Sequence, residues 1–570
     1  MFSSKLIFAT LAIIIVFTSG RYAGPSNRSS PELSAPTSLF WGKNNGISYL
    51  TVTRNHNIPQ YCTSSWAVAA TTVLSDRFKV LRNSSWPDYN ISPQVALSCI
   101  SGVQGCTTEG DPVSVYEYIY QNGITDETCA SYQARDFSNG IACDRLAVCK
   151  NCLPNGKCDI PNRYFVYNIT TFAVAKGPTQ MVNALQSGPI VCQIGVTSQF
   201  QSYQSGILTP TSGAAVLFTA YVSIVGYGVS STGTNYWIGR NSWGTAWGDA
   251  GFFNLVSGSN ALGIENYCVY PTPNKTVTVV TTNNQGKEER SYVDIAELHK
   301  LEEEPEEPIQ GYLRAKPVAE EALSAVPTTW DWGNVKGKNY LSWVRNQNIP
   351  QFCNASWAFA STSSLTDRFN ILIFNDTFPQ FTISPQVLLN CGVGNCTGGD
   401  PTAVYNWARM NGIPDDTCQQ YVGDFFETCN ATQVCQTCVS PAPANDTVNS
   451  VCNQVTPAHL FKVGNYGNLA GVTKMKQEIY NNGPITCGIY ASKAFAGYTG
   501  GIFSEYSRST TISNFVSVVG WGIEKNSNNE YWIGRNSWGT SWGEYGYFKM
   551  QMYRDNLGIE TDCTWATPSF

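Results

Sequence analysis

The sequence predicts an α+β protein made of two tandem copies of a two-lobed domain. A short motif occurs twice, as QYCTSSW at 60–66 and QFCNASW at 351–357, and each copy opens an apolar stripe of helical period. Strand-type runs follow late in each half, at 221–225 and 235–238 and again at 515–519 and 530–533. A helix first and strands last indicate a helical lobe and a β-barrel-like lobe with a cleft between them.

The length and composition of the chain limit the classes of protein to which it can belong. A chain of 570 residues is too long for one ordinary domain. Its net charge is −6 and it has no basic tract, so we expect neither nucleic acid nor an anionic membrane surface as a partner. The pair Cys149/Cys152 and its twin Cys435/Cys438 raise the alternative of a zinc site, but no histidine has matching spacing. We therefore predict no metal and no cofactor.

The first 20 residues are typical of a secretory signal peptide. Lys5 precedes an apolar run at 6–17, and small residues follow it. A membrane anchor is the alternative, but this run is too short to span a bilayer, and no later run is long enough. An even number of cysteines in each half and ten glycosylation sequons also favour the secretory route, ending outside the cell, in a lysosome or vacuole, or in a granule. The sequons are Asn27, Asn83, Asn90, Asn168, Asn274, Asn354, Asn375, Asn395, Asn430 and Asn445.

The cysteines map the duplication, because equivalent ones lie about 290 residues apart, as Cys62 and Cys353 do. We predict a short N-terminal segment at 21–34, domain 1 at 35–273, an acidic linker at 274–324 and domain 2 at 325–570. Residues 285–324 hold 11 Asp or Glu against 5 Lys or Arg, with no cysteine or tryptophan. This composition indicates a solvated linker without a core of its own, in which a short helix at 294–304 is an option.

Further motifs repeat in the same order in both halves. RNSWGTAWG at 240–248 recurs as RNSWGTSWG at 535–543, and NIPQYC at 57–62 recurs as NIPQFC at 348–353. Together with the first motif, with WDW at 330–332 and with the ten-cysteine pattern, they resemble the papain family of cysteine proteases, of the cathepsin X/Z type. The resemblance covers about 480 of the 570 residues.

The resemblance assigns roles by position. In the family a cysteine attacks the peptide carbonyl, a histidine moves the proton, an asparagine orients the histidine and a glutamine helps to hold the oxyanion. Each role falls on one residue in each repeat, and the residue of repeat one is given first. The resemblance assigns the nucleophile to Ser65 and Ser356, the base to Ala220 and Asn514, and the orienting residue to Asn241 and Asn536. It assigns the oxyanion position to His56 and Gln347, and the mini-loop that anchors a substrate carboxylate to Asn57 and Asn348. Glycines that pair with substrate backbone would be Gly398, Gly399 and Gly110, with Glu109 replacing the fourth.

Neither repeat has a competent catalytic set by this assignment. A serine hydroxyl needs a base, and neither alanine nor a neutral amide accepts a proton at neutral pH. The chain has only three histidines, of which His56 lies on the oxyanion side, His299 in the linker and His459 after the disulfide-rich segment. Loss of nucleophile and base together costs about 10⁶ in rate. We predict an inactive homologue.

The resemblance also implies five disulfides in each repeat, with no free thiol left. The pairs are Cys62–Cys106, Cys99–Cys143, Cys129–Cys149, Cys152–Cys158 and Cys192–Cys268, then Cys353–Cys396, Cys391–Cys429, Cys418–Cys435, Cys438–Cys452 and Cys487–Cys563.

Three functions stay open from the sequence. The first is a tandem pseudo-protease that binds a peptide or protein. The second is a residual hydrolase that uses Ser65 or Ser356. The third is a structural glycoprotein of a secreted or granule matrix. The retained glycines favour the first over the third, although a glycine pair is also typical of a plain turn.

Overall fold

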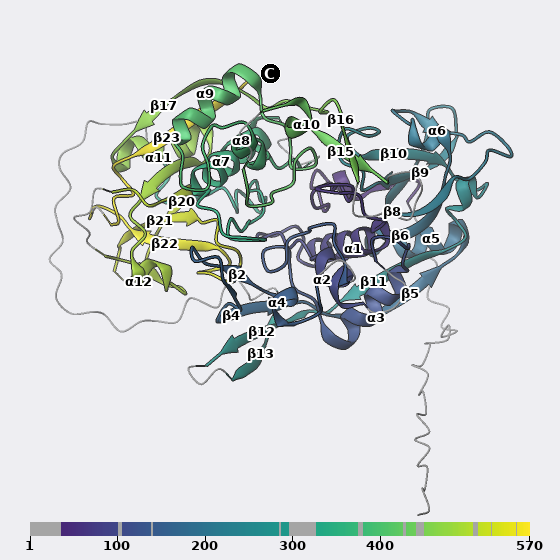
Figure 1. Cartoon of the computed structure of the whole chain (residues 1–570), viewed down its shortest axis with the longest axis horizontal. Helices are drawn as coiled ribbons and strands as arrows, with labels where there is room; N and C mark the ends of the chain where they lie inside the picture. The colour runs from purple at the N-terminus through teal and green to yellow at the C-terminus, as the bar shows by residue number, and fades with distance from the viewer. Residues whose placement is uncertain are drawn as a thin grey trace, which may run out of the picture. The chain divides into compact units, whose positions relative to one another are not determined.

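In the computed structural model, each repeat has its own eight-stranded sheet and its own set of helices (Figure 1). The structure describes residues 36–100, 105–137, 141–283, 287–295, 326–373, 380–425, 429–440, 450–505, 511–525, 527–554 and 556–569. From Thr37 to Phe570 the chain forms one compact unit that includes both repeats. No helix in the described part is long and apolar enough to cross a membrane.

The helices come in the same order in the two repeats. Repeat one contains α1 (Ser65–Leu81), α2 (Pro93–Cys99), α3 (Pro112–Asn122), α4 (Arg145–Val148), α5 (Gly177–Leu185) and α6 (Ser198–Gln201). Repeat two contains α7 (Ser356–Ile373), α8 (Gln386–Asn390), α9 (Pro401–Asn411), α10 (Ala431–Val434), α11 (Val472–Asn482) and α12 (Lys493–Ala496).

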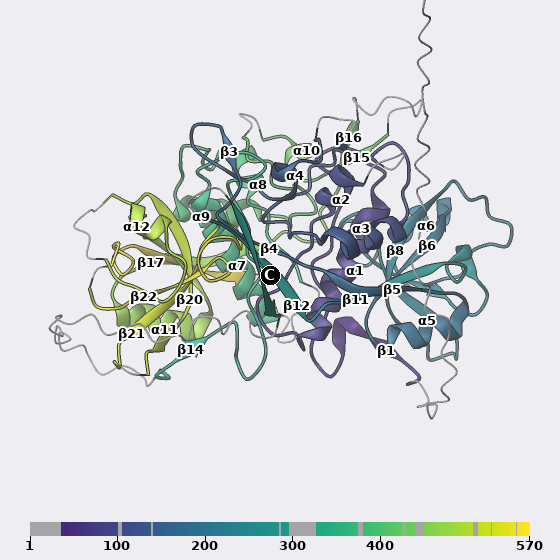
Figure 2. The ribbon, with the colours of Figure 1, turned by 90° about the horizontal axis from the view of Figure 1, so that it is seen from below.

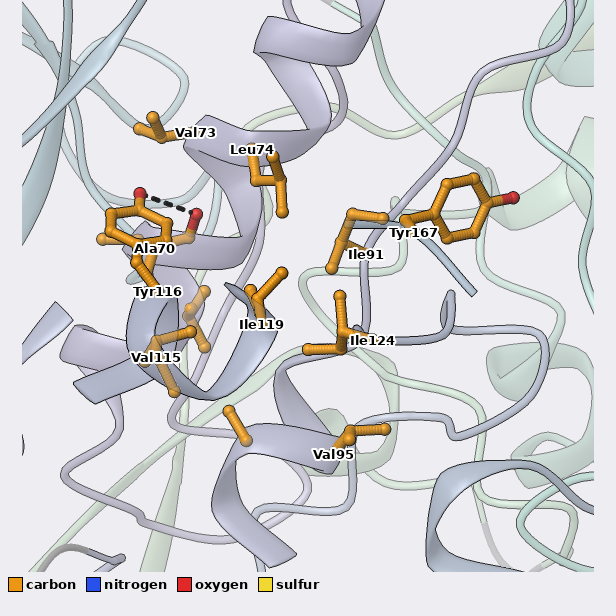
Figure 3. Packing of buried hydrophobic residues seen from close by; sticks show 14 of the residues in the cluster. Ala70, Val73, Leu74, Ile91, Val95, Val115, Tyr116, Ile119, Ile124 and Tyr167 are labelled. Carbon is orange, nitrogen blue, oxygen red and sulfur yellow. Dashed lines mark hydrogen bonds between the residues drawn. The ribbon is translucent and has the colours of Figure 1, made fainter. Parts of the chain in front are cut away.

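Helix α1 is the centre of the first helical lobe. Its apolar side chains pack against α2 and α3, and the hydroxyl of Tyr116 on α3 donates to the carbonyl of Ala70, 3.1 Å away (Figure 3). The helix is buried on all sides from Ser65 to Lys79, so its burial is wider than the single stripe that periodicity predicts. The last apolar position of that stripe is exposed in both repeats, at Leu81 and Leu372, because the helix has left the core by then.

The two large sheets have the same topology. The strand order is β5-β11-β6-β8-β9-β10-β7 in repeat one and β17-β23-β18-β20-β21-β22-β19 in repeat two. In the first sheet the strands are β1 (Leu39–Phe40), β5 (Ile169–Ala175), β6 (Ile190–Val196), β7 (Ile207–Leu208), β8 (Phe218–Val229), β9 (Asn235–Arg240), β10 (Phe252–Val256) and β11 (Cys268–Pro273). In the second they are β14 (Trp330–Asp331), β17 (Lys462–Leu469), β18 (Ile485–Ile489), β19 (Ile502–Phe503), β20 (Asn514–Ile523), β21 (Glu530–Arg535), β22 (Tyr547–Gln551) and β23 (Cys563–Ser569).

A buried ion pair ties the central helix to the sheet in each repeat. Asp76 on α1 pairs with Arg240 on β9, and Asp367 on α7 pairs with Arg535 on β21, with 2.6 Å between Oδ2 and Nη2 in the second pair. Each arginine comes directly before the asparagine that the resemblance assigns as orienting. The pair therefore sets the position of the sheet lobe against the helix that carries the serine.

The first third of the predicted linker is folded. Strands β12 (Thr276–Thr282) and β13 (Glu288–Asp294) form a hairpin that pairs with β4 (Arg163–Val166). The predicted linker bounds of 274–324 include the buried valines at 277, 279 and 280, which pack on repeat one rather than on a core of their own. The helix option at 294–304 lies almost entirely outside the described residues, because Asp294 ends β13 and only Ile295 follows it.

Ten disulfides are present, and they join the same pairs that the resemblance implies. Cys152–Cys158 links the small strands β2 (Asn151–Cys152) and β3 (Cys158–Asp159). Cys438–Cys452 links β15 (Gln436–Val439) and β16 (Val451–Gln454) in the same way.

The two repeats contact each other through a self-complementary surface. Asn55 Nδ2 donates to the carbonyl of Thr417 at 2.9 Å, and its equivalent Asn346 Nδ2 donates to the carbonyl of Thr128 at 2.9 Å. Thr245 Oγ1 donates to Asp415 Oδ2 at 2.7 Å, and Thr540 Oγ1 donates to Asp126 Oδ2 at 2.9 Å. Because each patch meets its counterpart in both directions, the arrangement is that of a two-fold dimer within one chain.

One aromatic anchor breaks this symmetry. Tyr545 of repeat two is buried in the core of repeat one, where its ring stacks on Phe165 with 4.2 Å between centroids and lies near Tyr89. The equivalent position in repeat one is Ala250, which packs on the core of repeat two with a methyl group only. At this pair of positions the interface therefore has one large apolar contact and one small one, and Trp86 of repeat one adds another aromatic contact, with 4.4 Å between its ring centroid and that of Tyr547.

Candidate active-site clefts

In repeat one the fold brings the predicted nucleophile position to the predicted base position. Ser65 is the first residue of α1 and is buried. Its Oγ accepts a hydrogen bond from the backbone N–H of Tyr221 on β8, at 3.0 Å. The neighbour of Tyr221 on β8 is Ala220, so a methyl group stands where the resemblance places the base.

Repeat two has the same backbone arrangement with a different side chain. Ser356 begins α7, and its Oγ accepts from the backbone N–H of Phe515 at 3.1 Å. Asn514 precedes Phe515 on β20, and its Nδ2 donates to Oδ1 of Asn536 at 3.2 Å. The predicted base and orienting positions are thus in contact, but the group at position 514 is an amide that donates a hydrogen bond.

The two predicted orienting asparagines are buried in equivalent surroundings. Asn241 Oδ1 accepts from the backbone N–H of Ser242 at 2.8 Å, and Asn536 Oδ1 accepts from that of Ser537 at 2.9 Å. The Nδ2 atom of each has no hydrogen-bond partner among the described residues. A buried amide nitrogen without a hydrogen bond is unfavourable. The packing around each side chain and the bond to its Oδ1 therefore hold it in place, and its Nδ2 does not.

His56 lies in repeat one as Gln347 lies in repeat two. Nδ1 of His56 is 2.7 Å from the hydroxyl oxygen of Ser242, and Oε1 of Gln347 accepts from the hydroxyl of Ser537 at 2.7 Å. When Ser242 donates this bond, the imidazole proton is on Nε2, so both residues present an Nε2–H group. In that tautomer His56 offers a ring N–H at the position where Gln347 offers an amide N–H.

Burial keeps His56 neutral and makes it sensitive to acid. Removal from water lowers its pKa from 6.5 to about 4. Between these values the native state binds fewer protons at this position than the unfolded state, so its contribution to stability is full above pH 6.5 and is lost as the pH falls toward 4.

We therefore expect His56→Gln to gain stability relative to the wild type in acid. The unfolding free energy of His56→Gln minus that of the wild type should rise by about 2–3 kcal/mol when the pH is lowered from 7.5 to 4.5. Denaturant titrations of both proteins at the two pH values measure this change. The titration of groups that both proteins share contributes equally to each and cancels in the difference. A difference that does not change with pH would show that position 56 is not buried as described.

Glu109 spans the first cleft. Its Oε1 accepts from Ser65 Oγ at 2.9 Å, and its Oε2 accepts from Thr219 Oγ1 at 2.9 Å. Ser65 belongs to the helical lobe and Thr219 to β8 of the sheet lobe, so this carboxylate joins the two walls at the nucleophile position. Partial burial raises its pKa, while the two hydroxyl donors lower it. The sequence placed Glu109 at the cleft edge, and in the structure its carboxylate is bonded to the predicted nucleophile position and to β8.

The predicted glycines have structural reasons of their own. A Cβ on Gly399 would lie 2.4 Å from the indole of Trp357, the second residue of α7. Gly398 has a φ of +144°, in the region that favours glycine, and nothing lies within 4 Å of an added Cβ. Gly110 is buried directly before Asp111, which caps α3. Gly398 therefore faces open space, whereas Gly399 packs against Trp357.

The mini-loop of repeat one contacts repeat two. The carbonyl of Asn57 accepts from the backbone N–H of Cys438 at 3.2 Å. Asn348 is buried, and its Oδ1 has no partner among the described residues. Figures 1 and 2 both show the β15–β16 hairpin, in green, beside the purple first part of repeat one.

Some functional positions were missed by the sequence reasoning. The paired contacts of Thr128, Asp126, Thr417 and Asp415 follow a Thr/Pro-Asp-Asp/Glu-Thr pattern at 125–128 and 414–417 that recurs in both halves. This recurrence was a usable signal.

Among the predicted sequons, Asn90 is buried, so a glycan there does not fit this structure, whereas Asn83 and Asn430 are exposed. No cluster of potential metal ligands occurs among the described residues.

Comparison with known proteins agrees with this geometry. Residues 35–272 and 326–567 each match the family described as papain family cysteine protease. Each matched range holds one of the two long central helices, α1 or α7, and one of the two large sheets. The chain belongs to the papain family, as a tandem duplication.

Individual relatives cover one repeat at a time. Cathepsin Z of Onchocerca volvulus is 43% identical over 251 residues, which span 43% of this chain and 78% of the relative. A gut-specific cysteine proteinase of Caenorhabditis elegans is 28% identical and covers 42% of this chain and 74% of its own. Among solved structures, bromelain from Ananas comosus, in complex with the inhibitor E64, is 27% identical over 42% of this chain and all of its own, with a TM-score of 0.33.

Proposed function

We propose that this protein is a catalytically silent, tandem papain-family protein of the secretory route that binds a peptide or protein ligand. The observation that carries the proposal is the base position. Ala220 has no proton-accepting atom, and Asn514 donates its amide hydrogen to Asn536. In each cleft a backbone N–H also donates to the serine oxygen. A serine hydroxyl without a base is a weak nucleophile.

We further propose that the two clefts differ in access. In repeat one the Glu109 carboxylate lies across the serine and links both lobes. In repeat two the equivalent residue is Gly398, which leaves the corresponding space open. An extended peptide must pass the serine to lie along a cleft of this type. Repeat two is therefore the repeat that we assign to ligand binding.

A second candidate function rests on one specific contact. Ser65 Oγ is 2.9 Å from a carboxylate oxygen, which is within reach for a general base. Against it, the other oxygen of Glu109 is held by Thr219, and the carboxylate fills the place that a substrate acyl group would need. A negative charge there would also oppose the developing oxyanion. The contact fits a closed cleft better than a hydrolase.

The labelling of the serines tests the proposal. We expect no reaction of fluorophosphonate or epoxide probes with Ser65 or Ser356, as followed by intact mass and peptide mapping, and no cleavage of peptide substrates. Stoichiometric labelling of Ser65 that disappears in Glu109→Gln would establish the hydrolase instead. Mass spectrometry of material released by acid from the native protein distinguishes the remaining options. Bound peptides support the binding function, and a multimeric lattice without ligand supports the structural one.

A further inference from the structure

A small buried cavity lies in repeat one between helix α1, strand β8 and the end of strand β9. Its volume is about 10 Å³, which is the space that one water-sized species needs. Ser65, Ala220 and Glu109 of the first cleft are not among the residues that line it. The cavity is therefore a separate space inside the domain and not a part of the cleft surface.

The lining of this cavity includes buried polar atoms that have no hydrogen-bond partner among the described residues. These atoms are Nε and Nη2 of Arg54, Oγ1 of Thr72, Nε of Arg240 and Nδ2 of Asn241. The side chains of the two arginines are only 9% and 2% exposed, and Thr72 and Asn241 are buried. Buried donors without a partner are costly, so a group of them around one space indicates that the space holds an acceptor.

The unpaired atoms decide which acceptor fits. All of them except Oγ1 of Thr72 are nitrogens that can only donate, since neither a guanidinium nor an amide NH₂ group accepts a hydrogen bond. A water molecule has lone pairs for only some of these donors, and its own protons would find no acceptor here except Thr72. A monoatomic anion accepts hydrogen bonds from every direction and brings no proton, so it matches this lining better than water does.

The charges around the cavity also favour an anion. Nη1 of Arg54 donates to Glu127, and Nη2 of Arg240 donates to Asp76, but neither carboxylate lines the cavity. Burial lowers the pKa of Arg240, Asp76 raises it, and the positive charge of Arg54 lowers it again. The two guanidinium groups are thus close enough to repel each other, and a negative charge in the cavity would offset this repulsion.

In repeat two the arginine at the equivalent position finds partners within its own repeat. Arg345, the equivalent of Arg54, donates through Nη2 to the hydroxyl oxygens of Thr362 and Ser363, at 2.9 and 3.3 Å. Ser363 stands on α7 where α1 has Thr72, whose hydroxyl has no partner among the described residues. The donors of the two arginines are therefore used differently, although the backbone arrangement is the same.

Fewer buried donors are left over in repeat two. Among the atoms that correspond to the cavity lining, Nε of Arg535 and Nδ2 of Asn536 are the ones without a partner in the described part of the chain. One water molecule can accept from both of them. The argument for an anion therefore applies to repeat one and not to repeat two.

We propose that this cavity is a binding site for one chloride ion, which accepts hydrogen bonds from Arg54, Arg240 and Asn241. A polyatomic anion such as acetate or phosphate is too large for a space of about 10 Å³. Because the lining comes from α1, from the end of β9 and from the segment of Arg54, the bound ion joins these parts and stabilises repeat one. The proposal does not depend on whether either cleft binds a peptide.

Thermal unfolding of the full-length protein tests the site in solution. At constant ionic strength, replacing isethionate by chloride from about 1 to about 100 mM is expected to raise the unfolding temperature by roughly 3–5 °C, because an ion that binds only the native state stabilises it. The rise should level off as the site fills. Isethionate has the same charge but is too large for the cavity, so an unfolding temperature that does not change between the two salts would contradict the proposal.

Crystals grown with bromide in place of chloride locate the ion, because bromide scatters X-rays anomalously. We expect an anomalous peak inside the cavity, next to Arg54 and Arg240, and no peak at the equivalent place beside Arg345 and Arg535. A cavity that is empty or holds a water molecule at high bromide concentration would overturn the proposal. This experiment uses the wild-type protein and so decides the question even if a variant fails to fold.

Asn241→Asp and Asn536→Asp are a matched pair of variants. An aspartate at position 241 places a carboxylate oxygen where Nδ2 now lies, and this oxygen repels an anion, so the rise in unfolding temperature with chloride should be lost. The same change at position 536 in repeat two should leave the full rise. Loss of the rise in both variants, or in neither, would show that chloride does not act at the cavity of repeat one.

Discussion

Ser356→Cys combined with Asn514→His is expected to give repeat two peptidase activity, about 10³-fold or more above the wild-type background. The backbone N–H of Phe515 already places position 514 beside Ser356. An imidazole introduced at position 514 would meet Oδ1 of Asn536, which now accepts from Asn514. A thiol at the start of α7 would also be favoured as thiolate by the helix dipole. Hydrolysis of fluorogenic peptides measures the gain.

The matching pair in repeat one, Ser65→Cys with Ala220→His, is expected to return much less activity. The obstacle is Glu109, which bonds Ser65 and Thr219 across the cleft. The oxyanion side is not the obstacle, because His56 lies as Gln347 does. Adding Glu109→Gly to the repeat-one pair should therefore raise its activity toward that of repeat two.

Two controls belong to this experiment. Asn354→Gln in all variants excludes a glycan next to Ser356, since residues 354–356 form a sequon. The single variants Ser356→Cys and Asn514→His should each stay near background, because nucleophile and base act as a unit. Equal recovery in both repeats without Glu109→Gly would show that the carboxylate does not close the first cleft.

Tyr545→Ala is expected to lower the free energy of unfolding by about 3 kcal/mol or more and to uncouple the two repeats. The ring is buried in the other repeat's core and stacks on Phe165 at 4.2 Å. Its counterpart is only Ala250, so the matching position in repeat one makes no contact of similar size. Calorimetry should show two transitions where the wild type shows one, because the repeats would no longer unfold together.

Tyr545→Phe is the matched control for the interface. The hydroxyl of Tyr545 is buried and has no partner among the described residues, so removing it should cost nothing. Tyr292→Ala, at an exposed tyrosine on β13, should likewise be neutral. If Tyr545→Ala unfolds in one transition at the wild-type temperature, the repeats are not held together by this anchor.

The fold and the members of each cleft were predictable from the sequence. The motifs around Ser65 and Ser356, and the RNSW motifs at 240–243 and 535–538, repeat with fixed spacing, and local patterns of this kind set helix starts and strand ends. The disulfide pairs were predicted from the cysteine positions by means of the resemblance to the papain family. What failed was the predicted start of the linker at 274, because the valines at 277, 279 and 280 can pack on a neighbouring strand without a core of their own.

The sequence by itself determined that two papain-type domains follow each other, and through the resemblance it predicted serine, alanine and asparagine at their catalytic positions. Only the tertiary structure decided that Glu109 bonds both Ser65 and Thr219, that His56 lies as Gln347 does, and that Tyr545 packs in the core of the other repeat. The physical reason is that these roles depend on contacts between segments far apart in the chain. Periodicity and motifs report local preference, whereas the direction of a side chain across a cleft or an interface is set by what packs around it.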